Sequence, residues 1–157
     1  DQPRSRGLGD VYKRQAQAYV QTWDLVDSGK HLDYDGNSTY MSYINTGAAT
    51  WNAYKSGVIR KDSAFVVEDV YVSDVNASNG WAGMTYSSGK IELNTYYMSG
   101  YSNSKKQNVA THELGHALGL DHSTSTDVMD AAITGHTSTQ ALSQNDKDSY
   151  DAAYNNY

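Results

Sequence analysis

Three histidines and a glutamate fall within eleven consecutive residues, at a spacing that suits a single metal ion. His112 and His116 are one helical turn apart, so on a helix both imidazoles project from the same side and can bind one ion. Glu113 lies beside His112 and can reach a metal-bound water without being a ligand. His122 can supply a third ligand once the chain has left the helix and turned back.

Gly119 comes three residues after His116 and is the residue best able to take the left-handed conformation that ends a helix. Three neutral imidazoles with one position left for water form a catalytic zinc site rather than a closed structural one. Zinc would lower the pKa of its water, and Glu113 would accept the proton as the hydroxide attacks a carbonyl. An ordinary helix with surface histidines fits poorly, since three of only five histidines lie here.

The chain around these residues predicts the helix that they need. A serine between residues 102 and 104 can cap a helix running from about Lys105 to Leu118. Its apolar stripe consists of Ala110, Leu114, Ala117 and Leu118. A closing helix is expected over Ser143 to Tyr154, and the chain between Gly119 and Gln140 is expected to be irregular.

The first half of the chain predicts strands and one helix. Strands are expected over His31–Tyr34, over Phe65–Val75 as one strand or a bent pair, and over 81–86 and 90–94 as a hairpin. Ser38 or Thr39 is expected to cap a helix that ends near Lys55, with Gly57 as its stop. Strands first and helices last indicate a single α+β domain with a twisted mixed sheet.

The extended motif from His112 to His122 resembles that of the metzincins, and later residues narrow the resemblance to the matrixins. Asp127-Val128-Met129-Asp130 is similar to the Met-turn, in which a methionine packs beneath the metal site without binding it. The segment after Ala141 resembles the closing helix of matrixin catalytic domains. The resemblance implies a metzincin-like fold and a zinc-dependent endopeptidase whose substrate is a protein or peptide, with zinc held by the three histidines and Glu113 as the base.

The chain also departs from the matrixin pattern. Animal matrixins hold a second, structural zinc, but only His31 and His136 remain here, so that site is not carried over. The Pro-x-Tyr segment that helps to wall the specificity pocket is absent, because residues 130–133 read Asp-Ala-Ala-Ile. Asn108 matches a position that edges the pocket, and we interpret it as a candidate substrate-pocket residue. An Asp33-x-Asp35-x-Asn37 string begins like a calcium loop but lacks its later ligand, so Ca²⁺ stays possible and unassigned.

Composition sets outer limits on function. The net charge of −6 and the pI of about 5.1 argue against a nucleic-acid-binding surface. No apolar run predicts a transmembrane segment. The absence of cysteine excludes disulfides, thiolate metal sites and a cysteine nucleophile.

The first fifteen residues are expected to be non-native, because residues 5–15 resemble a translated sequencing adapter. Leaving out residues 1–15 removes four basic and two acidic residues, so the net charge changes from −6 to −8. Residues 16–157 are then the matrixin-like catalytic domain. A signal peptide or pro-segment in front of it would have been lost, so secretion is expected from the resemblance alone, together with a monomeric state.

Two other functions stay open at this point. One is a non-catalytic, zinc-binding extracellular module on the same fold, which the presence of Glu113 disfavours. The other is a metzincin of narrow specificity that processes particular peptides. The physiological substrate does not follow from the residues.

Overall fold

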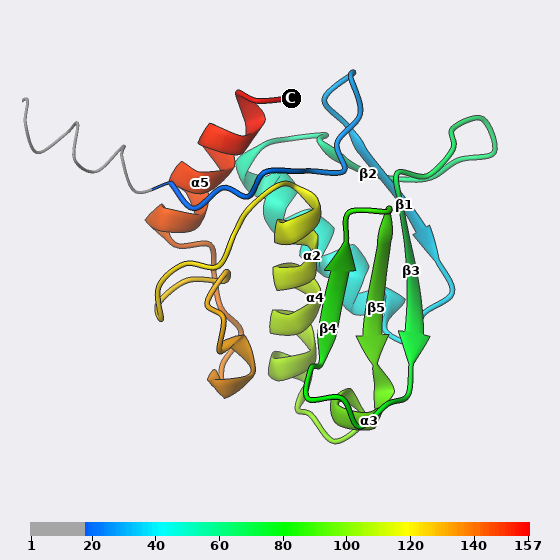
Figure 1. Ribbon diagram of the computed structural model, residues 1–157, viewed down its shortest axis with the longest axis vertical. Helices are drawn as coiled ribbons and strands as arrows, with labels where there is room; N and C mark the ends of the chain where they lie inside the picture. The colour runs from blue at the N-terminus through cyan, green and yellow to red at the C-terminus, as the bar shows by residue number, and fades with distance from the viewer. Residues whose placement is uncertain (1–17) are drawn as a thin grey trace, which may run out of the picture.

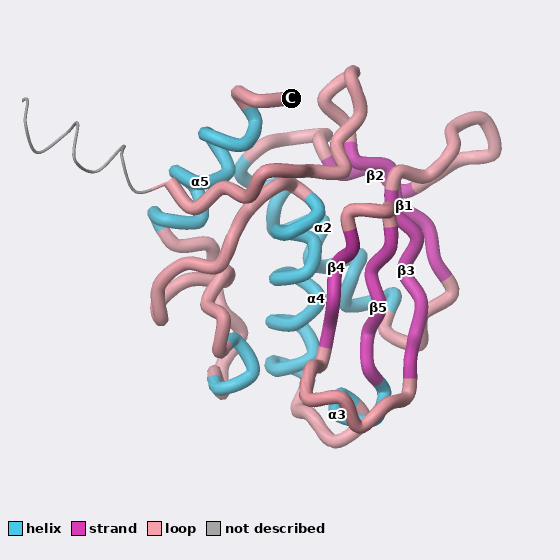
Figure 2. The backbone as a smooth tube through the Cα atoms, in the orientation of Figure 1, coloured by secondary structure: helices cyan, strands magenta, loops and turns pink. Residues whose placement is uncertain are grey.

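The computed structural model describes residues 18–157, so the predicted non-native segment 1–15 lies outside the described residues. Figure 1 shows a sheet with helices packed on one side of it, and Figure 2 shows the long loops that join the later elements. None of the helices in the described part is long and apolar enough to cross a membrane. The elements are β1 (Leu32–Gly36), α2 (Met41–Tyr54), β2 (Ile59–Lys61), β3 (Val70–Val75), β4 (Gly83–Tyr86), β5 (Lys90–Asn94), α3 (Thr95–Met98), α4 (Asn103–Ala117), η1 (Ile133–Gly135) and α5 (Gln144–Tyr154).

The five strands form one mixed sheet in the order β2-β1-β3-β5-β4. β1 pairs in parallel with both β2 and β3, and β3 pairs in parallel with β5. β4 alone runs antiparallel, in a hairpin with β5 that sets Thr85 opposite Ile91. The predicted α+β fold with a mixed sheet is therefore confirmed, as is the hairpin.

The core lies between the sheet and the helix layer. Central strands supply Leu32, Val72 and Ile91, all fully buried, while Trp51 of α2 and Leu114 of α4 fill the space from the other side. The indole nitrogen of Trp51 donates to the main-chain oxygen of Thr111, at 2.9 Å, which ties α2 to α4. The helix that carries the histidines is thus fixed against the centre of the fold.

Three local predictions were wrong. Phe65 to Asp69 do not belong to a strand, because β3 begins only at Val70 and the residues before it form an exposed loop. The strand β2 was missed, since it has only three residues and a single buried side chain. Neither Ser38 nor Thr39 is the N-cap of α2; its N-cap is Tyr40, which makes no side-chain capping bond, and the Ser38 hydroxyl accepts from the Tyr40 amide just before the helix.

Candidate active site

The helix α4 carries four of the predicted site residues, Asn108, His112, Glu113 and His116, and is capped at both ends as expected. The Ser102 hydroxyl accepts from the main-chain amide of Lys105 at its start. At its end Gly119 has φ 95°, the left-handed conformation in which glycine is favoured. The chain then turns back, and the amide of Leu120 donates to the main-chain oxygen of Gly115. This turn allows His122 to face the helix.

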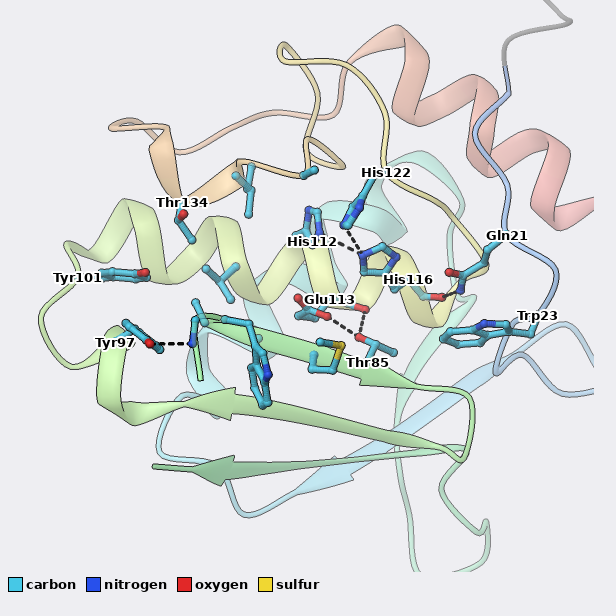
Figure 3. Close-up of a pocket in the computed structure, with 18 residues that line it drawn as sticks. Gln21, Trp23, Thr85, Tyr97, Tyr101, His112, Glu113, His116, His122 and Thr134 are labelled. Atoms are coloured by element: carbon cyan, nitrogen blue, oxygen red, sulfur yellow. Dashed lines mark hydrogen bonds between the residues drawn. The ribbon is translucent and has the colours of Figure 1, made fainter. Parts of the chain in front are cut away.

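The structure brings the three histidines together (Figure 3). The Nε2 atom of His116 lies 3.1 Å from that of His112 and 3.1 Å from that of His122. The Nδ1 atom of His112 donates to the main-chain oxygen of Val128, and that of His116 to the oxygen of Leu120, each at 2.8 Å. These bonds place the ring protons on Nδ1 and leave the two Nε2 lone pairs directed into the same space.

The arrangement of the three histidines fits a bound cation. Burial lowers the pKa of His112 to about 3 and that of His116 to about 4, so both rings are neutral at pH 7. Two bare lone pairs that face each other at 3.1 Å repel unless a positive ion lies between them. The spacing is close to the value of about 3.3 Å expected for neighbouring nitrogen ligands of a tetrahedral zinc.

Glu113 points into the same cleft from the next position on α4. The residue is 5% exposed, and burial raises the pKa of its carboxyl to about 7 against the opposing effect of a hydrogen bond from Thr85. The Thr85 hydroxyl on β4 lies 2.7 Å from the carboxylate Oε2 and 2.9 Å from the main-chain oxygen of Glu113 (Figure 3). Thr85 is a site residue that the sequence analysis missed.

The edge strand β4 approaches Glu113 closely because of Gly83. A Cβ atom at this position would lie 2.8 Å from the Cγ atom of Glu113, a distance that real Cβ contacts do not show. Any larger residue would push the strand and the helix apart. The glycine therefore lets the main chain of β4 form one wall of the cleft.

The cleft has a volume of about 530 Å³ and is mostly apolar away from the histidines. Tyr97 and Tyr101 lie at one end of it and Trp23 with Gln21 at the other (Figure 3), and Val109 and Ile133 also line it. The Gln21 side chain donates to the main-chain oxygen of His116 at 2.7 Å, which holds the N-terminal segment on the end of α4. Neither Gln21 nor Trp23 carried a signal in the sequence, since their part in the cleft depends on where this segment crosses the helix.

Met129 is buried beneath α4. A Cβ atom on Gly115 would lie only 2.3 Å from its sulfur, so the methionine packs directly on the helix between the turns that carry His112 and His116. The turn before it is held by the buried carboxylate of Asp146, which accepts from the amides of Val128 at 2.8 Å and Met129 at 3.2 Å.

Asp146 belongs to a capping box with Ser143 at the start of α5, the closing helix expected from the sequence. Burial raises the pKa of its carboxyl, against the hydrogen bonds that it accepts. Through Val128, whose oxygen accepts from His112, this carboxylate is linked to the His112 ring by two successive hydrogen bonds. The Ser-x-x-Asp spacing predicts the cap but not the contact across to residue 128.

Asn108 is buried but does not line the cleft. Its side-chain amide donates to the main-chain oxygen of Ser138, and its oxygen accepts from the amide of Gln140. It therefore fixes the loop that follows η1. The loop itself is closed by His136, which bonds to Asp130 at 2.7 Å. Ala131 and Ile133, which lie where the sequence lacks a Pro-x-Tyr segment, line the cleft.

In the candidate calcium loop, the first carboxylate, that of Asp33, forms an ion pair. Both oxygens of the buried Asp33 accept from the Arg60 guanidinium, at 2.7 Å each. Asp27 and Asp69 lie near Asp33 in a second group of possible metal ligands. Arg60 thus offsets the charge of one of the three carboxylates of this group.

Comparison with known proteins agrees with this geometry. The family model of Matrixin matches residues 15–155, which include the whole site. The chain belongs to the matrixin family. Among curated proteins no match was found. Among solved structures, this matrixin is similar to high choriolytic enzyme 1, a hatching enzyme zinc-protease from the medaka fish Oryzias latipes, with 21% identity and a TM-score of 0.37. That alignment covers 64% of this chain and spans half (50%) of the hatching enzyme's length.

Proposed function

We propose that this matrixin is a zinc-dependent endopeptidase that hydrolyses internal peptide bonds of extended protein chains. The observation that carries the proposal is the meeting of three histidine Nε2 atoms with a buried carboxylate in one open cleft. His112, His116 and His122 would hold the zinc, which when bound supplies a Lewis acid that polarises a carbonyl and acidifies water. Zinc and protease activity are also what membership of the family supports.

Glu113 acts as the proton carrier in this proposal. Its carboxylate takes the proton of the attacking water and then passes it to the amine nitrogen that leaves. Burial raises its pKa to about 7, which suits a group that must accept and return a proton near neutral pH. A chain that had kept the fold only for binding would have no use for a carboxylate in this position, which disfavours the non-catalytic module.

Thr85 orients that carboxylate in both of its protonation states. Its hydroxyl donates to Oε2 while Glu113 is ionised. When Glu113 holds the proton, the hydroxyl can accept from it and donate to the main-chain oxygen of Glu113, 2.9 Å away. No reorganisation of the site is needed between the two steps.

The substrate would lie along β4. This strand pairs with β5 on one side only within residues 18–157, so its other edge can hydrogen-bond an extended peptide. An apolar substrate side chain would then enter the space between Tyr101, Val109 and Ile133. The proposal places the enzyme outside the cell, as its family suggests.

Replacing Glu113 by Gln tests the proposal. The variant is expected to keep its zinc, measured by elemental analysis, because the three histidines are untouched. Hydrolysis of casein is expected to fall by about 10²- to 10⁴-fold, since the proton carrier is lost. Turnover equal to that of the wild type would show that the mechanism is wrong, and a wild type that holds zinc without cutting casein or a peptide library would favour a binding module.

A further inference from the structure

The loop between β2 and β3 exposes apolar side chains. Residues 63–68 are all exposed and form the longest such run in the described chain. Phe65, the one phenylalanine of the chain, is 97% exposed, and Val67 is 84% exposed. Figure 1 shows this loop extending beyond the sheet, away from the helices. Three consecutive exposed apolar residues on a polar protein suggest a surface that another molecule binds.

The main chain of the loop is almost free of internal hydrogen bonds. Two of its six amides are bonded: that of Val66 donates to the oxygen of Ser63, and that of Ser63 to the Asp62 carboxylate. The amides of the remaining four residues, 64, 65, 67 and 68, have no acceptor within the described residues. The loop can therefore extend and pair with an open strand edge without breaking much structure.

We propose that the cleft of one copy takes this loop of a second copy as a substrate and cuts it within residues 63–68. The inference rests on the proposed peptidase function. The middle of the loop, residues 64–67, spans about 13 Å when extended, which matches the four residues of the open edge of β4 while both ends of the loop stay in place. Phe65 or a neighbouring valine then supplies an apolar side chain for the space beside Tyr101, Val109 and Ile133.

The sheet order makes the cut intermolecular. The loop joins β2, at the edge of the sheet far from the cleft, to β3 at the centre, whereas the cleft is beside β4 at the other edge. Four strand spacings, or about 19 Å, separate β2 from β4, and two, or about 10 Å, separate β3 from β4. The main-chain hydrogen bonds of Asp62 and Asp69 to β1 hold both ends of the loop at this distance from the cleft. A chain therefore cannot bring its own loop to its own cleft while the sheet stays intact, and the rate of cutting should rise with the square of enzyme concentration.

The cut chain should stay folded. Hydrolysis consumes one water: the carbonyl carbon gains the hydroxyl, and the nitrogen gains the proton and leaves as an amine. The two fragments remain joined because β1 pairs with β2 before the cut and with β3 after it. Hydrogen bonds from Asp62 to the oxygen of Tyr34 and from Asp69 to that of Asp33 hold both ends of the loop.

An inactive copy serves as the substrate in the test. The Glu113→Gln protein is incubated alone and with a catalytic amount of zinc-loaded wild type, and the fragments are identified by intact-mass spectrometry. We expect one early cut, within residues 63–68, only in the presence of wild type. A Phe65→Ser, Val67→Ser version of the inactive copy should be cut at least about tenfold more slowly, because the apolar side chains are gone. A Tyr96→Ser version is the matched control, since Tyr96 is exposed at 54% but lies outside the loop.

A parallel casein assay separates the two hypotheses. If wild type hydrolyses casein but leaves the inactive copy intact, or cuts it first outside residues 63–68, the self-cleavage proposal is wrong and the peptidase function stands. Equal cutting rates for the Phe65, Val67 variant and its parent would also overturn it. If wild type cuts neither protein, the proposed function itself has failed.

Discussion

Glu113 is held by a partner from a distant part of the chain. Thr85 lies 28 positions earlier, on the strand that forms the opposite wall of the cleft, and its hydroxyl reaches both the carboxylate and the main chain of Glu113. The position of the Glu113 carboxylate thus depends on how closely β4 approaches α4. Gly83 permits this close approach because it has no Cβ atom.

Substitution of Thr85 separates this orienting role from a structural one. Thr85→Val keeps the shape of the side chain and removes the hydroxyl, so kcat is expected to fall by about 10- to 100-fold with KM little changed. Thr85→Ser restores the hydroxyl and should recover most of kcat. Steady-state kinetics on one fluorogenic peptide measure both values. Equal losses in the Val and Ser variants would mean that packing, not the hydroxyl, matters here.

The clustering of the histidines and Glu113 could be predicted because their spacing is local. His112, His116 and Glu113 share one helical turn, and Gly119 marks where that helix must end. Thr85 and Asp146 could not be predicted, because their contacts with residues 113 and 128 follow from strand pairing and from the docking of α5. Asn108 was assigned to the right region, but its amide bonds a loop instead of lining the cleft.

At the scale of elements, α4 is supported from below by Met129. Gly115 makes this contact possible, since a Cβ atom there would lie 2.3 Å from the Met129 sulfur and 3.0 Å from Cζ2 of Trp51. The helix interior gives up the higher helix propensity of alanine for this close approach. The turn that carries Met129 also holds His112, through Val128.

Gly115→Ala is therefore expected to destabilise the protein despite alanine's preference for helices. Overpacking costs about 1–3 kcal/mol, more than the gain of up to about 1 kcal/mol in propensity. Thermal unfolding should show a lower Tm, and zinc titration a weaker affinity, because Met129 must move. Gly100→Ala is the control, since its Cβ would meet nothing closer than 3.8 Å. An unchanged Tm for Gly115→Ala would show that the contact is not tight in solution.

The predictions of the start of β3 and of β2 failed because strand pairing, and not residue composition, determines which residues form these strands. Phe65, Val66 and Val67 have strand-forming side chains, yet β1 pairs with β3 only from Val70 onward. The short strand β2 lacks the alternation that would reveal it and forms because β1 offers it a parallel edge. The closing helix was predicted correctly, because the residues that form its capping box, Ser143 and Asp146, are only three positions apart in the sequence.

For the whole molecule, the burial of Glu113, which suits its proposed role as the base, lowers the stability of the metal-free protein at neutral and alkaline pH. Its pKa of about 7 in the metal-free chain compares with an ordinary value of 4.5. A raised pKa means that folding disfavours the ionised form of Glu113. The contribution of Glu113 to the free energy of unfolding is therefore fully present below pH 4.5 and is lost as the pH rises through 7. The loss corresponds to at most about 3 kcal/mol.

Zinc-free Glu113→Gln should consequently be more stable than zinc-free wild type at pH 8, and the difference should vanish at pH 4. Chemical denaturation in the presence of a chelator measures the free energy of unfolding at both pH values. Glu68→Gln, a change at an exposed position, is the matched control and should show no such difference. A stabilisation of equal size at both pH values would contradict the link to ionisation.

The four-residue length of β4 has a consequence for solubility. Within residues 18–157 this strand has one partner, so its free edge offers the same hydrogen bonds to any extended chain, another enzyme molecule included. A longer edge would bind a peptide more tightly through its main-chain hydrogen bonds. The same hydrogen bonds would promote fibrous aggregation. Because β4 has only four residues, an extended chain that binds to its free edge stays bound only briefly. The chain is then cut or released before further strands can add to it.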